Sequence, residues 1–148
     1  MTELPVGNPA GLRVLLVEDQ MIVAVEIEDT LRGLGCVVVG PVGTLEPAVR
    51  LAREEALDAA VLDVSLDGDY VFPVAEELKR REIPFIFATG CGEDILPDKW
   101  HGQVHLGKPF NREQLEKLLR NISSTSTEIS RIEGAARPPR RDSWGADG

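Results

Sequence analysis

The chain has 148 residues, 43% of them apolar, which is enough for one domain of ordinary size with a core. Its formal net charge of -9 argues against sequence-independent binding of nucleic acid, which needs a basic surface. No apolar run approaches the about 20 residues of a membrane helix, and residues 1–9 lack the features of a signal peptide. We therefore expect a cytoplasmic protein that neither binds nucleic acid nor inserts into a membrane.

Five short β-rich runs alternate with segments of helical spacing between residues 12 and 122. Each run is bounded by Gly, Pro, Asp or Glu, and the runs cover residues 13–17, 36–39, 59–64, 85–88 and 104–106. Apolar residues at helical spacing predict helices between them: Ile22, Val25, Ile27, Leu31 and Leu34; Leu45, Val49, Leu51 and Ala52; Val74, Ala75 and Leu78; and Leu115, Leu118 and Leu119.

The fourth helix is the weakest of the predicted helices. It would cover residues 93–100, but Pro97 interrupts it and leaves barely two turns. We expect a short or partly irregular segment there. The cluster Asp67-Gly68-Asp69 is interpreted as the turn into the third helix.

The alternation of strands and helices predicts an α/β fold. Strands that are apolar on nearly every residue are typical of a parallel sheet covered on both faces. We expect a five-stranded, doubly wound sheet of the flavodoxin-like (βα)5 type in a domain over residues 11–122. Residues 1–10 would form an N-terminal arm. Residues 123–148, rich in Ser, Thr and Gly with a Pro-Pro pair, would form a flexible tail.

The two cysteines, Cys36 and Cys91, lie far apart and form no CxxC pair or cluster with histidine. Neither a disulfide framework nor a zinc site is indicated. Buried, reduced thiols are expected.

Polar side chains follow the predicted strands where each strand ends. Because the carboxyl ends of parallel strands share one edge of the sheet, these side chains should converge on one pocket. The first strand is followed by two acids and the third, fourth and fifth by one polar residue each: Glu18, Asp19, Asp63, Thr89 and Lys108.

Three neighbouring carboxylates repel one another unless a cation with oxygen ligands or a raised pKa relieves the repulsion. Mg²⁺ suits an open acidic edge, since it binds one or two carboxylates together with water and phosphate oxygens. A carboxylate that attacks phosphorus becomes an acyl phosphate, whose charge a metal, an ammonium and a hydroxyl can stabilise. Asp63, Lys108 and Thr89 match the nucleophile, the ammonium and the hydroxyl.

Four segments, VLLVEDQ, AAVLDVSL, PFIFATG and HLGKPF, resemble in order and spacing the diagnostic segments of bacterial two-component receiver domains, the CheY-like family. The resemblance covers residues 12–122. It implies phosphorylation by a sensor histidine kinase or a histidine phosphotransfer protein, and output through protein contacts without a DNA-binding domain. It implies no enzymatic activity beyond self-phosphorylation from phosphodonors and slow self-dephosphorylation.

The resemblance also implies a role for each site residue. Asp63 would be the phosphoacceptor, and the ligands of Mg²⁺ would be Glu18, Asp19, Asp63 and the backbone carbonyl of Ser65. Thr89 would order on the phosphoryl group and Lys108 would contact it. The Lys108–Pro109 peptide bond would be cis.

Residues 87–90, FATG, followed by a short fourth helix, resemble the FATGUY subgroup of receivers. That signature continues with a bulky apolar residue and Tyr, whereas this chain has Cys91-Gly92. The usual switch aromatic, three residues before the lysine, is replaced by His105. Switching would then involve Thr89, with His105 either a packed strand residue or a participant.

Alternative interpretations remain for each residue and for the function. Glu18 and Asp19 could cap a helix, Asp63 could be a turn residue, Thr89 a helix cap and Lys108 a surface charge. A Mg²⁺-dependent phosphohydrolase would carry a second acid two residues after the nucleophile, where this chain has Ser65. A phosphorylation-independent scaffold would be marked by loss of a pocket residue.

Overall fold

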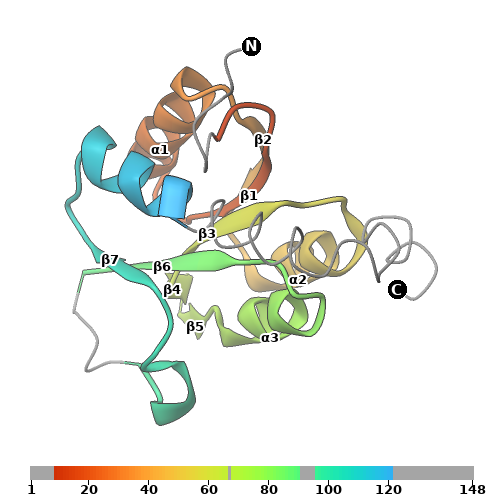
Figure 1. Cartoon of the computed structure of the whole chain (residues 1–148). Coiled ribbons are helices and arrows are strands. Elements are labelled where there is room, and N and C mark those ends of the chain that lie inside the picture. Colours follow the sequence, from red (N-terminus) through yellow and green to blue (C-terminus); the bar gives the residue numbers. More distant parts are fainter. Residues whose placement is uncertain (1–8, 67, 91–95, 122–148) are drawn as a thin grey trace.

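A computed structural model describes residues 9–66, 68–90 and 96–121, which form a five-stranded parallel sheet with helices on both faces (Figure 1). Its strand order is β2-β1-β3-β6-β7. The strands are β1 (Arg13–Val17), β2 (Val37–Val42), β3 (Ala59–Asp63), β6 (Phe85–Thr89) and β7 (His105–Gly107). The predicted doubly wound α/β architecture is confirmed, and β1 has the bounds that the sequence predicts.

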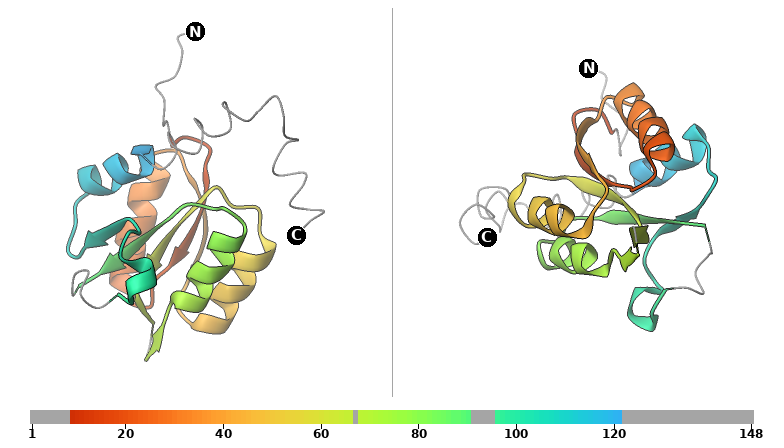
Figure 2. Two further views of the ribbon diagram at one scale, coloured as in Figure 1. Left: turned by 60° about the horizontal axis from the view of Figure 1, so that its bottom comes forward. Right: turned by 180° about the vertical axis from the view of Figure 1, so that it is seen from behind.

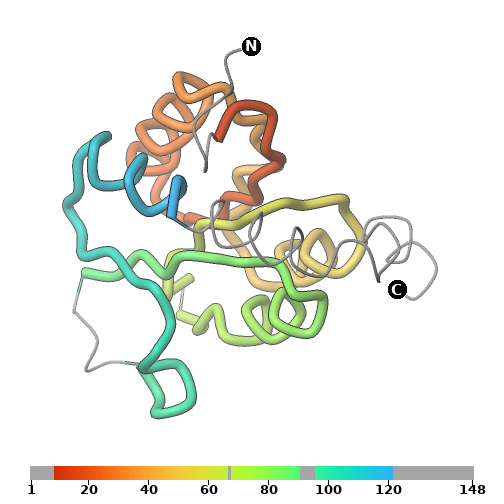
Figure 3. Tube along the Cα trace, viewed as in Figure 1, coloured from red at the N-terminus to blue at the C-terminus, as the bar shows by residue number. Residues whose placement is uncertain are grey.

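The helices divide between the two faces of the sheet. They are α1 (Met21–Gly33), α2 (Leu45–Glu54), α3 (Phe72–Arg80) and a helical segment over residues 112–121. Seen from two further directions, α2 and α3 lie together on one face, while α1 and the segment 112–121 cover the other (Figure 2). The Cα trace shows the chain leaving the sheet after β1 and β2 to form α1 and α2 on opposite faces (Figure 3).

The core follows from the alternation of side chains along each strand. In β3, the central strand, every residue is buried. Leu62 of β3 and Phe87 of β6 point toward α2 and α3, whereas Val61 and Ile86 point toward α1 and the segment 112–121. Two apolar clusters therefore hold the sheet rigidly between its helical layers.

The first predicted helix is confirmed as α1, and it buries only part of the apolar residues that predict it. Ala24, Ile27 and Leu31 contact the core, whereas Ile22 and Val25 are 76% and 48% exposed. Ile22 and Val25, whose spacing helps to predict this helix, therefore lie outside its buried face. Ala24 is small and gives a weak hydrophobic signal, yet it sits on the same stripe as Ile27 and Leu31.

The second strand continues beyond its predicted end at residue 39. Pro41 favours the end of a strand because it lacks an N–H donor, but β2 lies at the edge of the sheet, where proline is tolerated. Gly40 has a φ of +105°, and a Cβ at this position would lie 2.7 Å from the carbonyl oxygen of Leu16. The backbone irregularity at Gly40 lets β2 remain paired with β1 up to Val42.

A short antiparallel hairpin follows β3. It consists of β4 (Ser65–Leu66) and β5 (Asp69–Tyr70), with Leu66 opposite Asp69. We interpreted residues 67–69 as the turn into the third helix; Asp67 lies outside the described residues, and Asp69 opens β5 of a hairpin that precedes α3. The sequence did hold the signal, since Asp-Gly between two residues that pair is typical of a two-residue hairpin turn.

The predicted fourth helix is replaced, within the described residues, by one 3-10 turn, η2 (Asp98–Trp100). Trp100 is 2% exposed and packs into the cluster that contains α2 and α3. Residues 91–95 lie outside the described residues, as do the predicted tail over 123–148 and most of the predicted arm. Among the residues described, no helix has the length and apolar character needed to cross a bilayer.

The burial of individual side chains predicts that two isoleucines contribute very differently to stability. Ile86→Ala should lower the free energy of unfolding by about 2–5 kcal/mol, because Ile86 is fully buried in the central part of the sheet. The matched control Ile22→Ala should change it by under about 0.5 kcal/mol, since Ile22 is exposed. Urea denaturation measures both changes, and equal effects would contradict the layer assignment.

Candidate functional site

Two adjacent strands bring three carboxylates together at the carboxyl edge of the sheet. Glu18 and Asp19 follow β1, and Asp63 is the last residue of β3. The two strands are paired with Val17 opposite Leu62, so Glu18 and Asp63 lie at the same level. One carboxylate oxygen from each of Glu18, Asp19 and Asp63 lies within 4.8 Å of the other two.

Lys108 approaches the three carboxylates from the edge strand β7. Lys108 follows β7, and its backbone N–H donates to the carbonyl oxygen of Thr89 over 2.8 Å. Its Nζ lies 2.9 Å from Oε1 of Glu18 and 3.2 Å from Oδ2 of Asp63. The ammonium therefore bridges two of the three carboxylates.

Thr89 occupies the strand between Asp63 and Lys108. It is the last residue of β6, and the residue before it, Ala88, pairs with Asp63. Thr89 is 3% exposed, so it belongs to the buried side of the site. The structure thus places all five side chains that the sequence predicts for the site along one edge of the sheet.

Glu18 is almost completely buried, and both of its carboxylate oxygens have partners. Oε1 accepts a hydrogen bond from Lys108, and Oε2 accepts one from the backbone N–H of Gln20 over 3.1 Å. Sequence reasoning assigned Glu18 to the metal alone and missed its contact with Lys108. No sequence signal links two residues 90 positions apart, apart from the shared sheet edge.

Asp19 differs from Glu18 in its exposure. Its neighbour Gly43, in the loop after β2, has no side chain, and a Cβ there would lie 3.2 Å from the Cα of Asp19. The residue before α1 is Gln20, and it makes no side-chain capping bond. Asp19 is solvent-exposed, so its carboxylate can bind a cation with little rearrangement of the core.

Asp63 is 7% exposed and sits between an acid and a base. Its Oδ1 accepts a hydrogen bond from the backbone N–H of Ser65 over 3.3 Å, and its Oδ2 faces Lys108. Burial raises the pKa of the Asp63 carboxyl to about 7, and the Glu18 carboxyl adds to the rise while Lys108 opposes it. Without a further positive charge, this carboxylate is costly to ionise.

For Lys108, the neighbouring charges together have a larger effect on the pKa than burial has. Burial disfavours its charged form, but the hydrogen bond from its ammonium to Glu18 and the charge of Asp63 outweigh burial and raise the pKa of Lys108 above its ordinary value. The ammonium therefore stays protonated at neutral pH. The peptide bond that follows, Lys108–Pro109, is cis.

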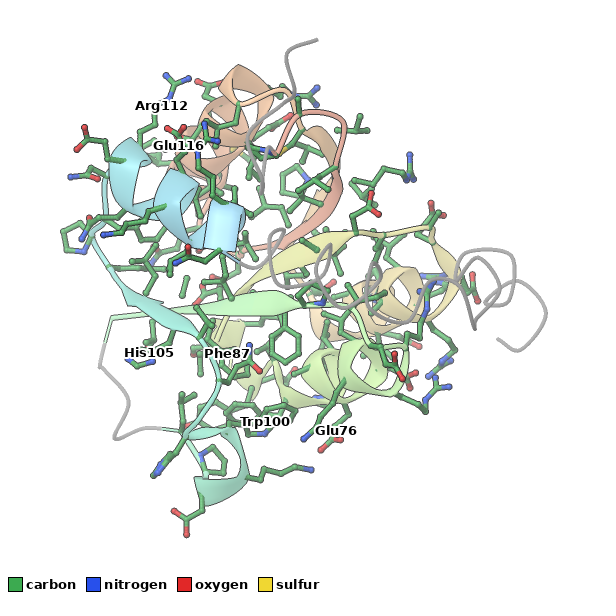
Figure 4. The ribbon with its side chains drawn as sticks, viewed as in Figure 1. Glu76, Phe87, Trp100, His105, Arg112 and Glu116 are labelled. Carbon is green, nitrogen blue, oxygen red and sulfur yellow. The ribbon has the colours of Figure 1, made fainter. Side chains whose placement is uncertain are left out.

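His105 and Ser65 lie beside the site in different ways. His105 is half-buried on β7 and pairs with Phe87 of β6 (Figure 4). Ser65 opens the hairpin after β3 and is exposed. His105 is thus part of the sheet, as a packed strand residue would be.

This arrangement offers oxygen ligands, a nucleophile and positive charge in one place. Three carboxylates from adjacent strands suit a hard divalent cation, which would relieve their mutual repulsion. Asp63 is the carboxylate nearest the middle of the sheet edge, with an ammonium 3.2 Å from one of its oxygens. Such a set can bind an anionic phosphoryl group once a cation offsets the negative charge.

Comparison with known proteins gives close structural relatives. SdrG from Sphingomonas melonis Fr1 is 37% identical with a TM-score of 0.68, and the match covers 76% of this chain and 96% of that one. The receiver domain of the sensor histidine kinase PA1611 from Pseudomonas aeruginosa PAO1 is 30% identical with a TM-score of 0.68, covering 77% and 98%. That structure holds a magnesium ion in its active-site cleft.

Among curated proteins, the regulator PhyR of Methylorubrum extorquens is 34% identical over 101 residues, which cover 66% of this chain and 38% of PhyR. The chain spans less than two thirds of the length of the curated relatives that it matches. No protein-family model matches the chain. The fold, the clustered acidic residues and the identity to SdrG and the PA1611 domain agree: the chain belongs to the receiver-domain family of two-component response regulators.

Proposed function

We propose that Asp63 is the phosphoacceptor of this receiver domain. The observation that carries the proposal is the bridge from Lys108 to Asp63, in the same acidic cluster as Glu18 and Asp19. A carboxylate oxygen of Asp63 would attack the phosphorus of a phosphohistidine and form an acyl phosphate. The phosphorus–nitrogen bond breaks, and the released imidazole takes up a proton.

The residues present fit a magnesium site. The ligands would be the carboxylates of Glu18, Asp19 and Asp63 and the backbone carbonyl of Ser65, a set of hard oxygen donors that is open toward Asp19. A bound Mg²⁺ would supply the positive charge that lets several carboxylates and a phosphoryl group share one site. A relative, the PA1611 receiver domain, carries magnesium in its cleft, which supports this assignment.

Lys108 and Thr89 would stabilise the phosphoryl group. Lys108 already holds its ammonium 3.2 Å from Asp63, so little reorganisation is needed to meet new negative charge there. Thr89 ends the neighbouring strand one residue beyond the level of Asp63, which suits a hydroxyl that donates to a phosphoryl oxygen. These two residues are electrostatic partners of the phosphoryl group and do not form covalent bonds to it.

The partner on the donor side would be a sensor histidine kinase or a histidine phosphotransfer protein in the cytoplasm. The output would be contact with another protein, with no nucleic acid bound by this domain. Its chemistry would be limited to self-phosphorylation from phosphodonors and slow self-dephosphorylation. Ser65 supports this limit, because a phosphohydrolase of the Asp-x-Asp type would use an acid at this position.

Asp63→Asn should abolish phosphorylation and leave the fold intact, because the amide keeps the shape of the side chain but is not a nucleophile. Incubation with Mg²⁺ and acetyl phosphate followed by intact-mass measurement tests this. Asp98→Asn is the control, since Asp98 is exposed on η2 and should not affect phosphate uptake. Undiminished phosphorylation of Asp63→Asn would refute the assignment.

Asp19→Asn should weaken Mg²⁺ binding on the order of tenfold or more, because the cation loses a charged ligand. Calorimetric titration with MgCl₂ measures the affinity. Asp29→Asn provides a matched control on the exposed side of α1. Equal affinities for all three proteins would place the metal elsewhere.

The raised pKa of Asp63 predicts a pH-dependent stability in the absence of Mg²⁺. The folded protein holds this proton more tightly than the unfolded chain, so the contribution of Asp63 to stability is present below about pH 4 and is lost as pH rises toward 7. Asp63→Asn avoids the cost of ionisation. In EDTA its thermal midpoint should exceed that of the parent at pH 8, and the difference should shrink at pH 5 and on addition of Mg²⁺. A difference independent of pH would contradict the argument.

A further inference from the structure

A row of aromatic rings connects the hairpin after Asp63 with the strand that ends in Thr89. Tyr70 stacks on Phe72 with ring centroids 5.6 Å apart, and Phe72 stacks on Trp100 at 6.2 Å. Trp100 in turn meets Phe87 edge to face at 5.6 Å. We call these four residues, Tyr70, Phe72, Trp100 and Phe87, the aromatic bridge.

Each end of the aromatic bridge is next to a residue of the proposed phosphorylation site. At one end, Tyr70 pairs directly with Ser65, whose N–H donates to Oδ1 of Asp63. At the other end, Phe87 lies two residues before Thr89 on the same face of β6. Because Trp100 packs against both Phe72 and Phe87, movement at either end of the bridge changes the surroundings of Trp100.

Trp100 packs against both Phe72 and Phe87, which also meet each other edge to face at 5.9 Å. It lies on the turn η2, in the described part of the segment where a fourth helix was predicted. Trp100 is 2% exposed, although the turn that carries it is only three residues long. Figure 4 shows its ring near Phe87, with Glu76 of α3 close by. A short turn has few backbone hydrogen bonds of its own, so its position depends on side-chain contacts.

Those contacts are of two kinds. Trp100 packs in the core against the rings of Phe72, Phe85 and Phe87, and the remaining contacts are electrostatic and lie nearer the surface. Lys99 forms an ion pair with Glu76, and its Nζ lies 5.2 Å from the centroid of the Trp100 ring. Lys79 of α3 places its Nζ 5.5 Å from the same ring. The ion pair and the cation–π contacts are individually weak, so the docked position of the turn depends mainly on the packing of Trp100 against its neighbouring rings. A change in the position of Phe72 or Phe87 would therefore shift the balance between a docked and a displaced turn.

From this geometry we propose that the aromatic bridge carries the phosphorylation state of Asp63 to the turn η2, with Trp100 displaced from its docked position on α3 in the phosphorylated protein. The proposal rests on the proposed function. A phosphoryl group adds between one and two negative charges beside the N–H of Ser65 and recruits Thr89. Tyr70, beside Ser65, and Phe87, on the strand of Thr89, are then both displaced. The surface formed by η2 and α3 changes as a result.

This route bypasses His105. His105 lies on the edge strand β7 and pairs with Phe87 through the backbone, whereas the ring contacts that define the bridge join Tyr70, Phe72, Trp100 and Phe87. A substitution of Tyr70 tests the route through the bridge. Tyr70 is 54% exposed and contributes little to the core, yet it forms the end of the bridge beside Ser65. Tyr70→Phe keeps the stacked ring and serves as its matched control.

The test uses the full chain with Trp144→Phe, which leaves Trp100 as its one tryptophan. The protein is phosphorylated with acetyl phosphate and Mg²⁺, and intact mass gives the phosphorylated fraction of the same sample. Because Trp100 starts almost fully buried, displacement can only raise its exposure. Quenching of its fluorescence by acrylamide should rise about twofold or more on phosphorylation. Tyr70→Phe and His105→Ala should keep this rise.

Tyr70→Ala should reach the same phosphorylated fraction and lose the rise. If quenching rises equally in Tyr70→Ala, or stays constant in the phosphorylated parent, the proposed route is wrong even though Asp63 accepts phosphate. Loss of the rise in His105→Ala alone would assign the route to β7 and overturn the proposal. If the parent takes up no phosphate at all, the proposed function itself fails, and the inference fails with it.

Discussion

One ion bridge organises the functional edge of this protein: the ammonium of Lys108 lies between the carboxylates of Glu18 and Asp63. It joins the ends of three strands that are far apart in sequence, and it does so at a place where all three groups are largely buried. Two carboxylates and one ammonium leave an excess of negative charge. Burial raises the pKa of Asp63, the Glu18 carboxyl adds to the rise, and the excess of negative charge makes a cation the natural complement of the site.

The sheet makes this bridge possible because parallel strands end at a common edge. β3 is buried on every residue and is paired on both sides, so Asp63 projects from the most constrained strand of the fold. The more exposed Asp19 lies at the start of the segment that leads to α1. Rigid support beneath Asp63 and open access beside Asp19 suit a site that must hold charge in place and still admit a phosphoryl donor.

The sequence predicted the sheet and the convergence of Glu18, Asp19, Asp63, Thr89 and Lys108 because both depend on strand order and strand ends alone. It failed where small or local features decide the structure. The buried stripe of α1 runs through Ala24, which a hydrophobic pattern undervalues, and β2 continues through Gly40–Pro41 because an edge strand tolerates both. The partners of Glu18 depend on side-chain geometry across 90 residues and could not be read from spacing.

In the described residues 96–100, which include the turn η2, burial is concentrated on few positions. A helix covers a strand with several side chains, so the loss of one contact is shared among its neighbours. Two side chains of this segment are buried, Leu96 and Trp100. Trp100 contacts the rings of Phe72, Phe85 and Phe87. Position 100 therefore has little mutational tolerance, because a smaller residue would leave a cavity among the three phenylalanine rings.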